Sequence, residues 1–396
     1  MAIATVSGPC AKRRSTAADD DALECVDLDD GRVTSARRRA AVEALRDISA
    51  TAGTRNRCRM QRLARQQPLS DAQLARFAVD ALIEEAELTP KPALVDGRGS
   101  GAHRDLDLPT MRRSARALEP TFAALARASR QRTPSATLRA ELAAIGRDGE
   151  QAMMRATGGS NAHRGAIWIV GLMIAGAAIG GAARGATGTS SASGTASVTA
   201  CAASAISSAW VSSVSSVASA ASTARYRALA EAATVCELGA QIACFPDRLA
   251  APADSNGERV RQRYQVGGAR VEAQQGFPHA LDIGLPALVQ ARARGVGEDA
   301  ARVDALLAIM ASLDDTCLLH RAGLAGLQAG QQGARRVLAA GGCSTHAGRA
   351  ELAALDRALV ALNASPGGAA DLLAATLFLD KLSRQDFTGS TTPWNT

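Results

Sequence analysis

Residues 165–183 read GAIWIVGLMIAGAAIGGAA and carry no charged side chain. A run of about 19 uncharged residues is long enough for one membrane span. This run is diluted by glycine and alanine, it lacks an aromatic belt, and no second span follows it. We therefore predict a helix buried in a protein core, and no stable association with a membrane. The alternative is a membrane anchor with a basic tail.

The composition around this run favours helices throughout the chain. Hydrophobic residues make up 47% of the 396 residues and aromatic residues only 3%, and alanine dominates the apolar share. Alanine has the highest helix propensity, whereas strands favour aromatic and β-branched side chains. No stretch alternates as a strand does. We expect an all-α fold: a single large helical domain with a flexible N-terminal extension and a low-complexity internal loop.

Helical periodicity begins at Ser70, which is a candidate N-cap residue for a helix that Pro90 and Pro92 end. Residues 263–276 are expected to form a glycine-containing connection. Further helices are expected at 111–129, 135–156, 165–183, 228–242, 285–294, 299–313, 324–340, 349–362 and 366–382.

Three segments fall outside this pattern. We predict a poorly ordered extension at 1–67, a helical catalytic domain at 68–385 with a low-complexity insert at 185–224, and a tail at 386–396. The net charge of +7 would ordinarily suggest a polyanionic partner. However, residues 1–67 contain 13 basic and 9 acidic side chains, so most of the excess lies outside the patterned body. We therefore expect no nucleic-acid partner.

Several common sites are missing from the sequence. None of the eight cysteines lies in a CxxC pair, which argues against a zinc ribbon or a redox dithiol. Reduced thiols and the absence of a signal peptide predict a cytoplasmic protein. No GxxxxGK[ST], HExxH or GxSxG motif occurs.

The first candidate for chemistry is Glu85, which falls on the apolar stripe of the helix that Ser70 begins. A carboxylate on a buried helix face is either functional or a structural residue paired with an arginine. The loop that follows adds Asp96, His103, Arg104 and Asp105.

Three of the five histidines precede an arginine, at His103-Arg104, His163-Arg164 and His320-Arg321. His163-Arg164 opens a helix that Ser160 or Asn161 caps. Free N–H groups, the positive end of the helix dipole and a guanidinium would then meet at one point, which suits a phosphate. The plain alternative is a capped helix with an exposed arginine.

Two more helix starts resemble anion sites. Ser365, Pro366 and Gly367-Gly368 form one, and Asp371 in its first turn either holds a cation or complements the dipole. Asp314 and Asp315 precede His320-Arg321, an arrangement that suits a magnesium–polyphosphate site or a solvated acidic turn.

These motifs together resemble one enzyme family over residues 74–382. The blocks are TPKPALVD (89–96) with SGAHRD (100–105), TGGSNAHRGAI (157–167), GARVEA (268–273) with GFPH (276–279), DDTCLLHR (314–321) and SPGGAADLL (365–373). They are similar to those of triphosphoribosyl-dephospho-coenzyme A synthases, and the last three are most similar to the branch that serves malonate decarboxylase. The chain departs from the family at Ala93, Val271 and Ala322, where glycine is usual, and near Ala369. A non-glycine residue at positive φ there would cost about 1 kcal/mol.

The resemblance implies a cytoplasmic, all-helical transferase that joins ATP to 3′-dephospho-coenzyme A. The 2′-hydroxyl of dephospho-coenzyme A attacks the anomeric carbon of the ATP ribose and expels adenine. The product is the precursor of an acyl-carrier prosthetic group and passes to a separate transferase. The runner-up is a helical, magnesium-dependent hydrolase of nucleotides or phosphosugars.

With this chemistry, the candidate residues divide into three groups. The catalytic candidates are Glu85, Asp96, His103, His163 and Asp315. The candidates for substrate and phosphate binding are Lys91, Arg104, Asn161, Arg164, Arg270, Glu272, His320, Arg321, Ser365, Gly367 and Gly368. The candidates for Mg²⁺ binding are Asp105, Asp314 and Asp371.

Overall fold

The computed structural model describes residues 68–186, 220–247 and 255–388. The predicted extension at 1–67, most of the predicted insert at 185–224, and residues 389–396 of the predicted tail lie outside the described residues. All described residues belong to one compact unit, residues 67–396. The proposed domain limits stay predictions.

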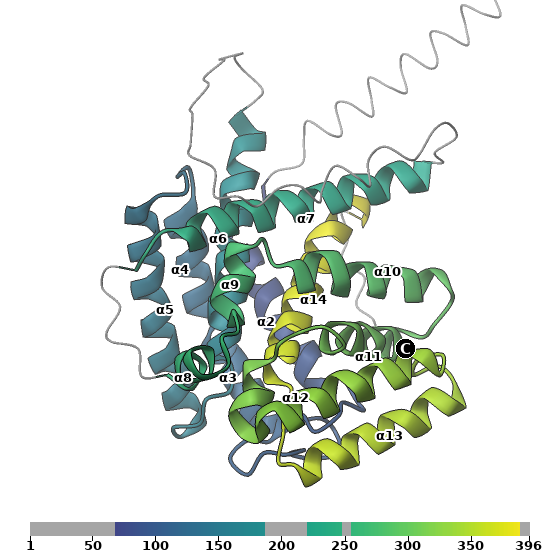
Figure 1. The fold of residues 1–396 in the computed structure, drawn as a ribbon. Helices are drawn as coiled ribbons and strands as arrows, with labels where there is room; N and C mark the ends of the chain where they lie inside the picture. Colours follow the sequence, from purple (N-terminus) through teal and green to yellow (C-terminus); the bar gives the residue numbers. More distant parts are fainter. Residues whose placement is uncertain (1–67, 187–219, 248–254, 389–396) are drawn as a thin grey trace, which may run out of the picture. The chain divides into compact units, whose positions relative to one another are not determined.

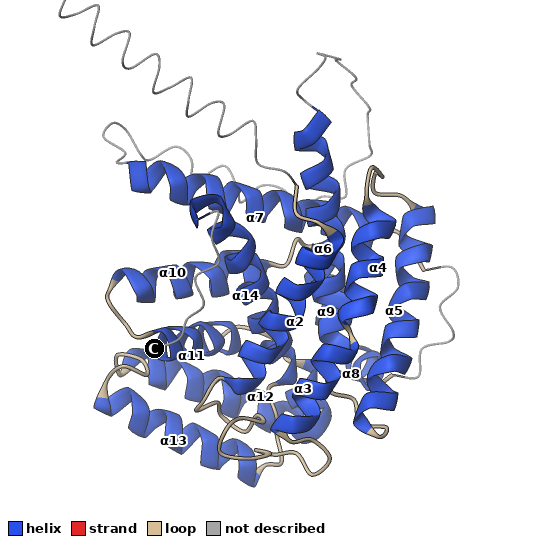
Figure 2. Ribbon diagram, turned by 180° about the vertical axis from the view of Figure 1, so that it is seen from behind, coloured by secondary structure: helices blue, strands red, loops and turns tan. Residues whose placement is uncertain are grey.

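The described part of the chain is built from helices joined by loops and contains no β-strand (Figure 2). The all-α prediction is confirmed. The helices are α2 (Asp71–Glu87), α3 (Leu108–Ala117), α4 (Glu119–Ser129), α5 (Ala136–Thr157), α6 (Arg164–Ala186), α7 (Ala220–Cys244), α8 (Asn256–Tyr264), α9 (Gly268–Gln274), a π-helix (His279–Gly284), α10 (Leu285–Ala293), α11 (Glu298–Met310), α12 (Thr316–Ala339), α13 (His346–Ala361) and α14 (Gly367–Thr388).

Helix α2 begins as the sequence predicts. The Ser70 side chain accepts a hydrogen bond from the Gln73 backbone, and the Gln73 side chain accepts one from the Ser70 backbone, which forms a capping box. The helix ends at Glu87, before Pro90. Its buried face packs against α4 and α14 (Figure 1).

Helix α6 is packed in the core, against α7, α4 and α14. Small residues allow the close approach to α7: a Cβ on Gly176 would lie 2.2 Å from the Val235 carbonyl oxygen. By length and composition, α6 is the one helix among the described residues that could cross a membrane, and 67% of its apolar window is buried inside the protein. A core helix of a soluble protein has the same composition.

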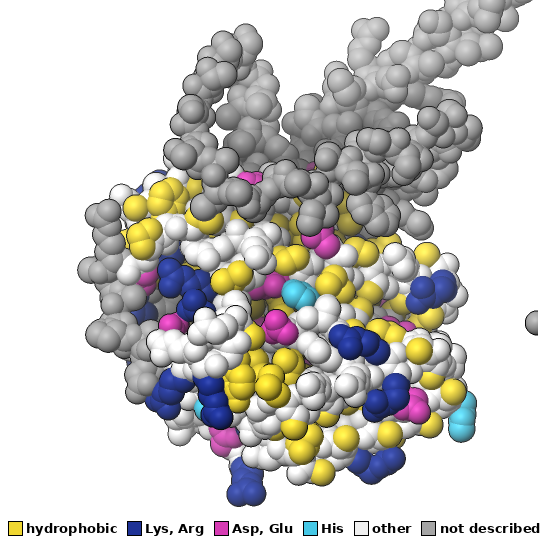
Figure 3. All heavy atoms as spheres, viewed as in Figure 1, with side chains coloured by type: hydrophobic (Ala, Val, Ile, Leu, Met, Phe, Trp, Pro, Cys, Tyr) yellow, Lys and Arg dark blue, Asp and Glu magenta, His cyan; other side chains and the backbone are white. Residues whose placement is uncertain are grey.

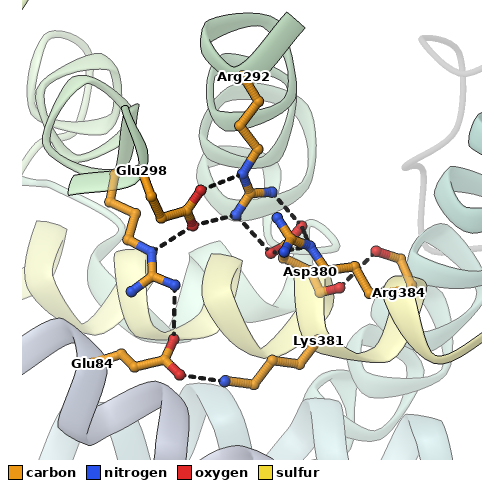
Figure 4. Close-up of polar contacts among 8 residues, drawn as sticks. Glu84, Arg292, Glu298, Asp380, Lys381 and Arg384 are labelled. Carbon is orange, nitrogen blue, oxygen red and sulfur yellow. Dashed lines mark hydrogen bonds and ion pairs between the residues drawn. The ribbon is translucent and has the colours of Figure 1, made fainter. Parts of the chain in front are cut away.

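A network of ion pairs ties α2 to α10, α11 and α14 (Figure 4). Arg292 pairs with both Glu298 and Asp380, at 2.6 and 2.7 Å. Glu84 receives Lys381 from α14, at 2.5 Å, and Arg302 from α11, at 3.2 Å. Glu84 is therefore a structural residue, although its neighbour Glu85 faces the cavity described below.

Apart from shifts at helix ends, the observed helices differ from the prediction in four places, the first being α8, which the sequence pattern did not predict. The helix expected at 111–129 breaks at Leu118, because Pro120 lacks an N–H group and starts α4. Helix α12 begins at Thr316 instead of 324 and bends at Gly323, where φ is 62°. The connection expected at 263–276 contains α9, and the π-helix follows it.

Candidate functional site

The predicted site residues, except Asp96 and Arg104, line one cavity of about 780 Å³. The starts of α6, α12 and α14 meet at this cavity, because Arg164, Thr316 and Gly367 all lie in its wall. Each helix start presents backbone N–H groups and the positive end of a dipole. The cavity therefore favours anionic ligands.

One wall holds a buried ion pair between Glu85 and Lys91. Their side chains approach to 2.6 Å, with Glu85 3% exposed and Lys91 1% exposed. The lysine Nζ also donates to the Glu85 carbonyl oxygen. The structural alternative for Glu85 required an arginine partner, but the partner is one of only three lysines in the chain. The pair fixes the Glu85 carboxylate at the cavity.

Asp96 and Arg104 do not reach the cavity. The Asp96 carboxylate accepts hydrogen bonds from the backbone N–H groups of Lys91 and Arg98, at 2.9 and 2.7 Å, and from the Arg98 side chain. Asp96 therefore holds the loop that places Lys91. Arg104 is exposed outside the cavity wall.

His103 joins this loop to α12 and α14. Arg321 Nη2 donates to its Nδ1 at 3.3 Å, so its Nε2 carries the proton that it shares with Ser365 Oγ at 2.8 Å. Burial, and then the charge of Arg321, lower the pKa of His103 to about 4. The imidazole is therefore neutral at physiological pH, and both of its nitrogens are engaged.

His163 differs from His103 in having one unoccupied nitrogen. Its Nδ1 lies 2.7 Å from Ser114 Oγ on α3, whereas its Nε2 is buried without a hydrogen-bond partner. Burial lowers the pKa of His163 to about 4. The side chain lines the cavity at the start of α6 and is neutral at physiological pH.

Asp315 connects two helix starts. Its carboxylate accepts from Cys317 and Leu318 as the N-cap of α12, and from Gly368 and Ala369 in the first turn of α14. Burial raises the pKa of Asp315 and the hydrogen bonds from these four N–H groups lower it, with a net increase. The carboxylate is occupied by backbone donors, which is the arrangement of a positioning group.

Asp371 faces the start of α6. A Cβ on Gly165 would lie 1.9 Å from Asp371 Oδ2, so a larger residue there would have to displace the Asp371 carboxylate. Burial, followed by the charges of Glu85 and Asp315, raises the pKa of Asp371 well above its ordinary value. Asp105, Asp314 and Asp371 all line the cavity. No group of three or more His, Cys, Asp or Glu side chains able to hold a metal occurs in the described ranges.

Glu272 on α9 also lines the cavity and binds His279. The carboxylate accepts from the His279 backbone N–H and pairs with its Nδ1, both at 2.8 Å. Burial lowers the pKa of His279, but the hydrogen bond and charge of Glu272 outweigh it, so the net pKa is raised.

Sequence reasoning missed Arg139 and Trp168, which line the same cavity. The Arg139 guanidinium lies 4.6 Å from the Trp168 ring centre. The sequence did hold a signal for both residues. Arg139 is three residues before the buried Leu142, which places it near the apolar face of α5, and Trp168 lies in the second turn of α6, close to the helix start.

At one of the positions where the family usually has glycine, the backbone has the positive φ that favours glycine. Ala93 has φ of 56°, whereas Val271, Ala322 and Ala369 are not among the residues with positive φ. The strain of about 1 kcal/mol applies at Ala93 alone.

Comparison with known proteins identifies the family of the chain. The sequence profile of the ATP:dephospho-CoA triphosphoribosyl transferase family matches residues 71–388. The chain belongs to this family. It is therefore an enzyme of the transferase class.

Relatives in this transferase family are similar over most of their length. The 2-(5″-triphosphoribosyl)-3′-dephosphocoenzyme-A synthase of Klebsiella pneumoniae is 50% identical over 310 residues, covering 78% of this chain and 94% of that protein. A probable synthase of the same name from Pseudomonas paraeruginosa is 51% identical, with coverage of 78% and 90%. One from Stutzerimonas stutzeri is 49% identical over 325 residues, with coverage of 81% and 95%. No solved structure matches the chain significantly.

Proposed function

We propose that this transferase joins ATP to 3′-dephospho-coenzyme A and releases adenine. The 2′-hydroxyl oxygen of dephospho-coenzyme A forms a bond to C1′ of the ATP ribose, and the bond from C1′ to N9 of adenine breaks. The triphosphate stays on the product. The observation that carries the proposal is that a buried carboxylate, a neutral histidine and several cationic groups meet in one cavity.

Glu85 is the group that we assign to the anomeric carbon. Displacement at this carbon develops positive charge on the ribose, as in glycoside hydrolysis, and a nearby carboxylate stabilises that charge. The pair with Lys91 keeps the carboxylate in place in a buried wall. A buried, fixed charge stabilises a developing opposite charge more than a solvated one does.

His163 is the group that we assign as the base for the 2′-hydroxyl proton. Of the two candidate histidines, His103 accepts from Arg321 and donates to Ser365, so its lone pair is occupied. His163 Nε2 is unoccupied. When Nδ1–H donates to Ser114, the Nε2 lone pair accepts the proton.

Magnesium would supply charge neutralisation on the phosphates. Mg²⁺ usually binds one or two carboxylates together with substrate phosphates and water, and seldom a complete protein cage. The donors at the cavity fit this mode, because Asp105, Asp314 and Asp371 line it without forming a cluster of three.

The test is to incubate the full chain with ATP, Mg²⁺ and dephospho-coenzyme A, and to follow the adduct and free adenine by mass spectrometry. We expect both products only when dephospho-coenzyme A is present. Adenine or phosphate release from ATP alone would instead indicate the hydrolase. Glu85→Gln should abolish turnover while ATP still binds, and normal turnover would remove Glu85 from the mechanism.

We further propose that the protein works in the cytoplasm and supplies the prosthetic-group precursor of malonate decarboxylase, by way of a separate transferase. Deleting the gene for this chain in its host should abolish malonate decarboxylation and leave citrate cleavage intact. Recovery of the protein in a membrane pellet after a high-salt wash would contradict the cytoplasmic location.

A further inference from the structure

One wall of the cavity carries a buried arginine that forms no ion pair with a described carboxylate. Arg139 on α5 is only 8% exposed, and its Nε has no hydrogen-bond partner. Among the described residues, no carboxylate forms an ion pair with it. A buried guanidinium without a directly paired carboxylate is costly, so an anionic ligand is the simplest explanation for its placement.

The surroundings of Arg139 increase this excess charge. Burial lowers the pKa of Arg139, Asp247 raises it, and the positive charges of Arg147 and Arg270 lower it further. Asp247 is itself bound to Arg147, at 2.7 Å. Arg270 lies on the cavity wall and is exposed, and no ion pair involves it in the described part of the chain. Figure 3 shows basic side chains gathered beside α5 and α9, next to acidic ones.

Trp168 holds Arg139 in an orientation suited to binding. The guanidinium lies over the indole ring, and the indole Nε1 donates to the Ala269 carbonyl at 3.1 Å, next to Arg270. Stacking occupies the flat face of a guanidinium and leaves the N–H groups at its edge available for oxygen ligands. The tryptophan thus links the two arginines of this wall.

Arg261 on α8 adds a second unoccupied group. Its Nη1 donates to Glu258, but its Nε is buried without a partner, and the residue lines the cavity.

Three of the cationic groups predicted from the sequence are already engaged, whereas Arg270 has no ion pair among the described residues. Lys91 pairs with Glu85, and Arg164 pairs with Glu150 at 3.1 Å. Arg321 donates to the Ala102 carbonyl and to His103. The buried Nε atoms of Arg139 and Arg261, which have no hydrogen-bond partner, and the side chain of Arg270 therefore lie on the α5–α8–α9 side of the cavity.

We propose that Arg139, Arg261 and Arg270 form a polyphosphate subsite, distinct from the wall that carries Glu85 and Lys91. The proposal rests on the proposed function, in which both substrates bring such a group: ATP a triphosphate, and dephospho-coenzyme A a pyrophosphate. The guanidinium edges bind the phosphate oxygens by charge-assisted hydrogen bonds.

The first test measures binding of inorganic tripolyphosphate to the full chain by calorimetry, which does not depend on turnover. Arg139→Gln and Arg270→Gln should each weaken binding about tenfold or more, the loss expected for one charge-assisted hydrogen bond. Arg112→Gln is the matched control, because Arg112 pairs with Glu87 outside the cavity. Wild-type affinity in both cavity variants would overturn the subsite, even if the reaction proves to be another one.

The second test identifies which substrate the subsite holds. In the active enzyme, a rise in KM for ATP alone in Arg139→Gln assigns the triphosphate, and a rise for dephospho-coenzyme A alone assigns the pyrophosphate. Unchanged KM values for both substrates would overturn the proposal. Because no described carboxylate forms an ion pair with Arg139, Arg139→Gln should unfold at the wild-type temperature or above. Arg270→Gln changes only an exposed side chain.

Discussion

The buried pair of Glu85 and Lys91 gives the sharpest stability prediction. Lys91→Met leaves the Glu85 carboxylate buried without its counter-ion, and Glu85 is only 3% exposed. Removing one partner of a buried ion pair costs about 3–5 kcal/mol, because the remaining charge is uncompensated. For a unit of about 330 residues, this loss lowers the unfolding temperature by about 4–7 °C.

A double-mutant cycle separates this effect from lost packing. Glu85→Gln combined with Lys91→Met removes both charges, so the double variant should recover part of the stability that Lys91→Met loses. The control is Arg112→Met, which breaks the pair with Glu87 on the same helix. That pair is 39% and 42% exposed, and its loss should cost less than about 1 kcal/mol.

Urea unfolding of the full chain, followed by circular dichroism, measures all four variants. If Lys91→Met costs no more than Arg112→Met, or if the two cavity substitutions simply add, the pair is not buried and coupled as the structure has it.

Three further predictions concern the cavity. Gly165→Ala forces the Asp371 carboxylate away and should lower kcat/KM about tenfold or more, whereas Gly146→Ala, whose Cβ would meet its nearest atom at 3.9 Å, should leave it unchanged. His163 has a folded pKa of about 4 against 6.5 unfolded, so the unfolded state binds more protons between these values. As the pH falls from 6.5 to 4, the wild type should lose stability relative to His163→Gln by at most about 1.4 kcal/mol per pH unit. If the difference in free energy of unfolding stays constant over this range, His163 is not buried as described. Asp315→Ala should destabilise the protein by about 2–3 kcal/mol in urea unfolding. The control, Asp107→Ala, removes a cap with one backbone donor and should cost less. Equal losses would refute the role of Asp315 in connecting the starts of α12 and α14.

The fold class follows from the sequence because its causes are local. Alanine propensity, the Ser70 cap and the 3.6-residue period act within one or two turns. The break at Leu118 was also visible in principle, since Pro120 cannot donate to the residue four before it. The π-helix carries no such local signal.

The site could be predicted only in part, because its pairings span long distances in the sequence. Motif order placed His103 and Ser365 in one site, but their hydrogen bond joins residues 262 positions apart. The sequence could not show that Asp96 holds its own loop while Glu85 reaches the cavity. Arg139 was missed because a single arginine on a helix face usually reaches solvent.

The contact of α6 with α7 has a mechanical consequence for the cavity. At Gly176 the two helices approach so closely that even a methyl group would collide with the Val235 carbonyl oxygen. Interiors packed this tightly have little compressibility, so they transmit strain instead of absorbing it. A methyl group added in the middle of α6 would shift the whole helix relative to α7. Because α6 begins at Arg164, that shift would also move the cavity wall. The glycines of α6 therefore set the distance between α6 and α7, and through it the position of cavity residues several turns away.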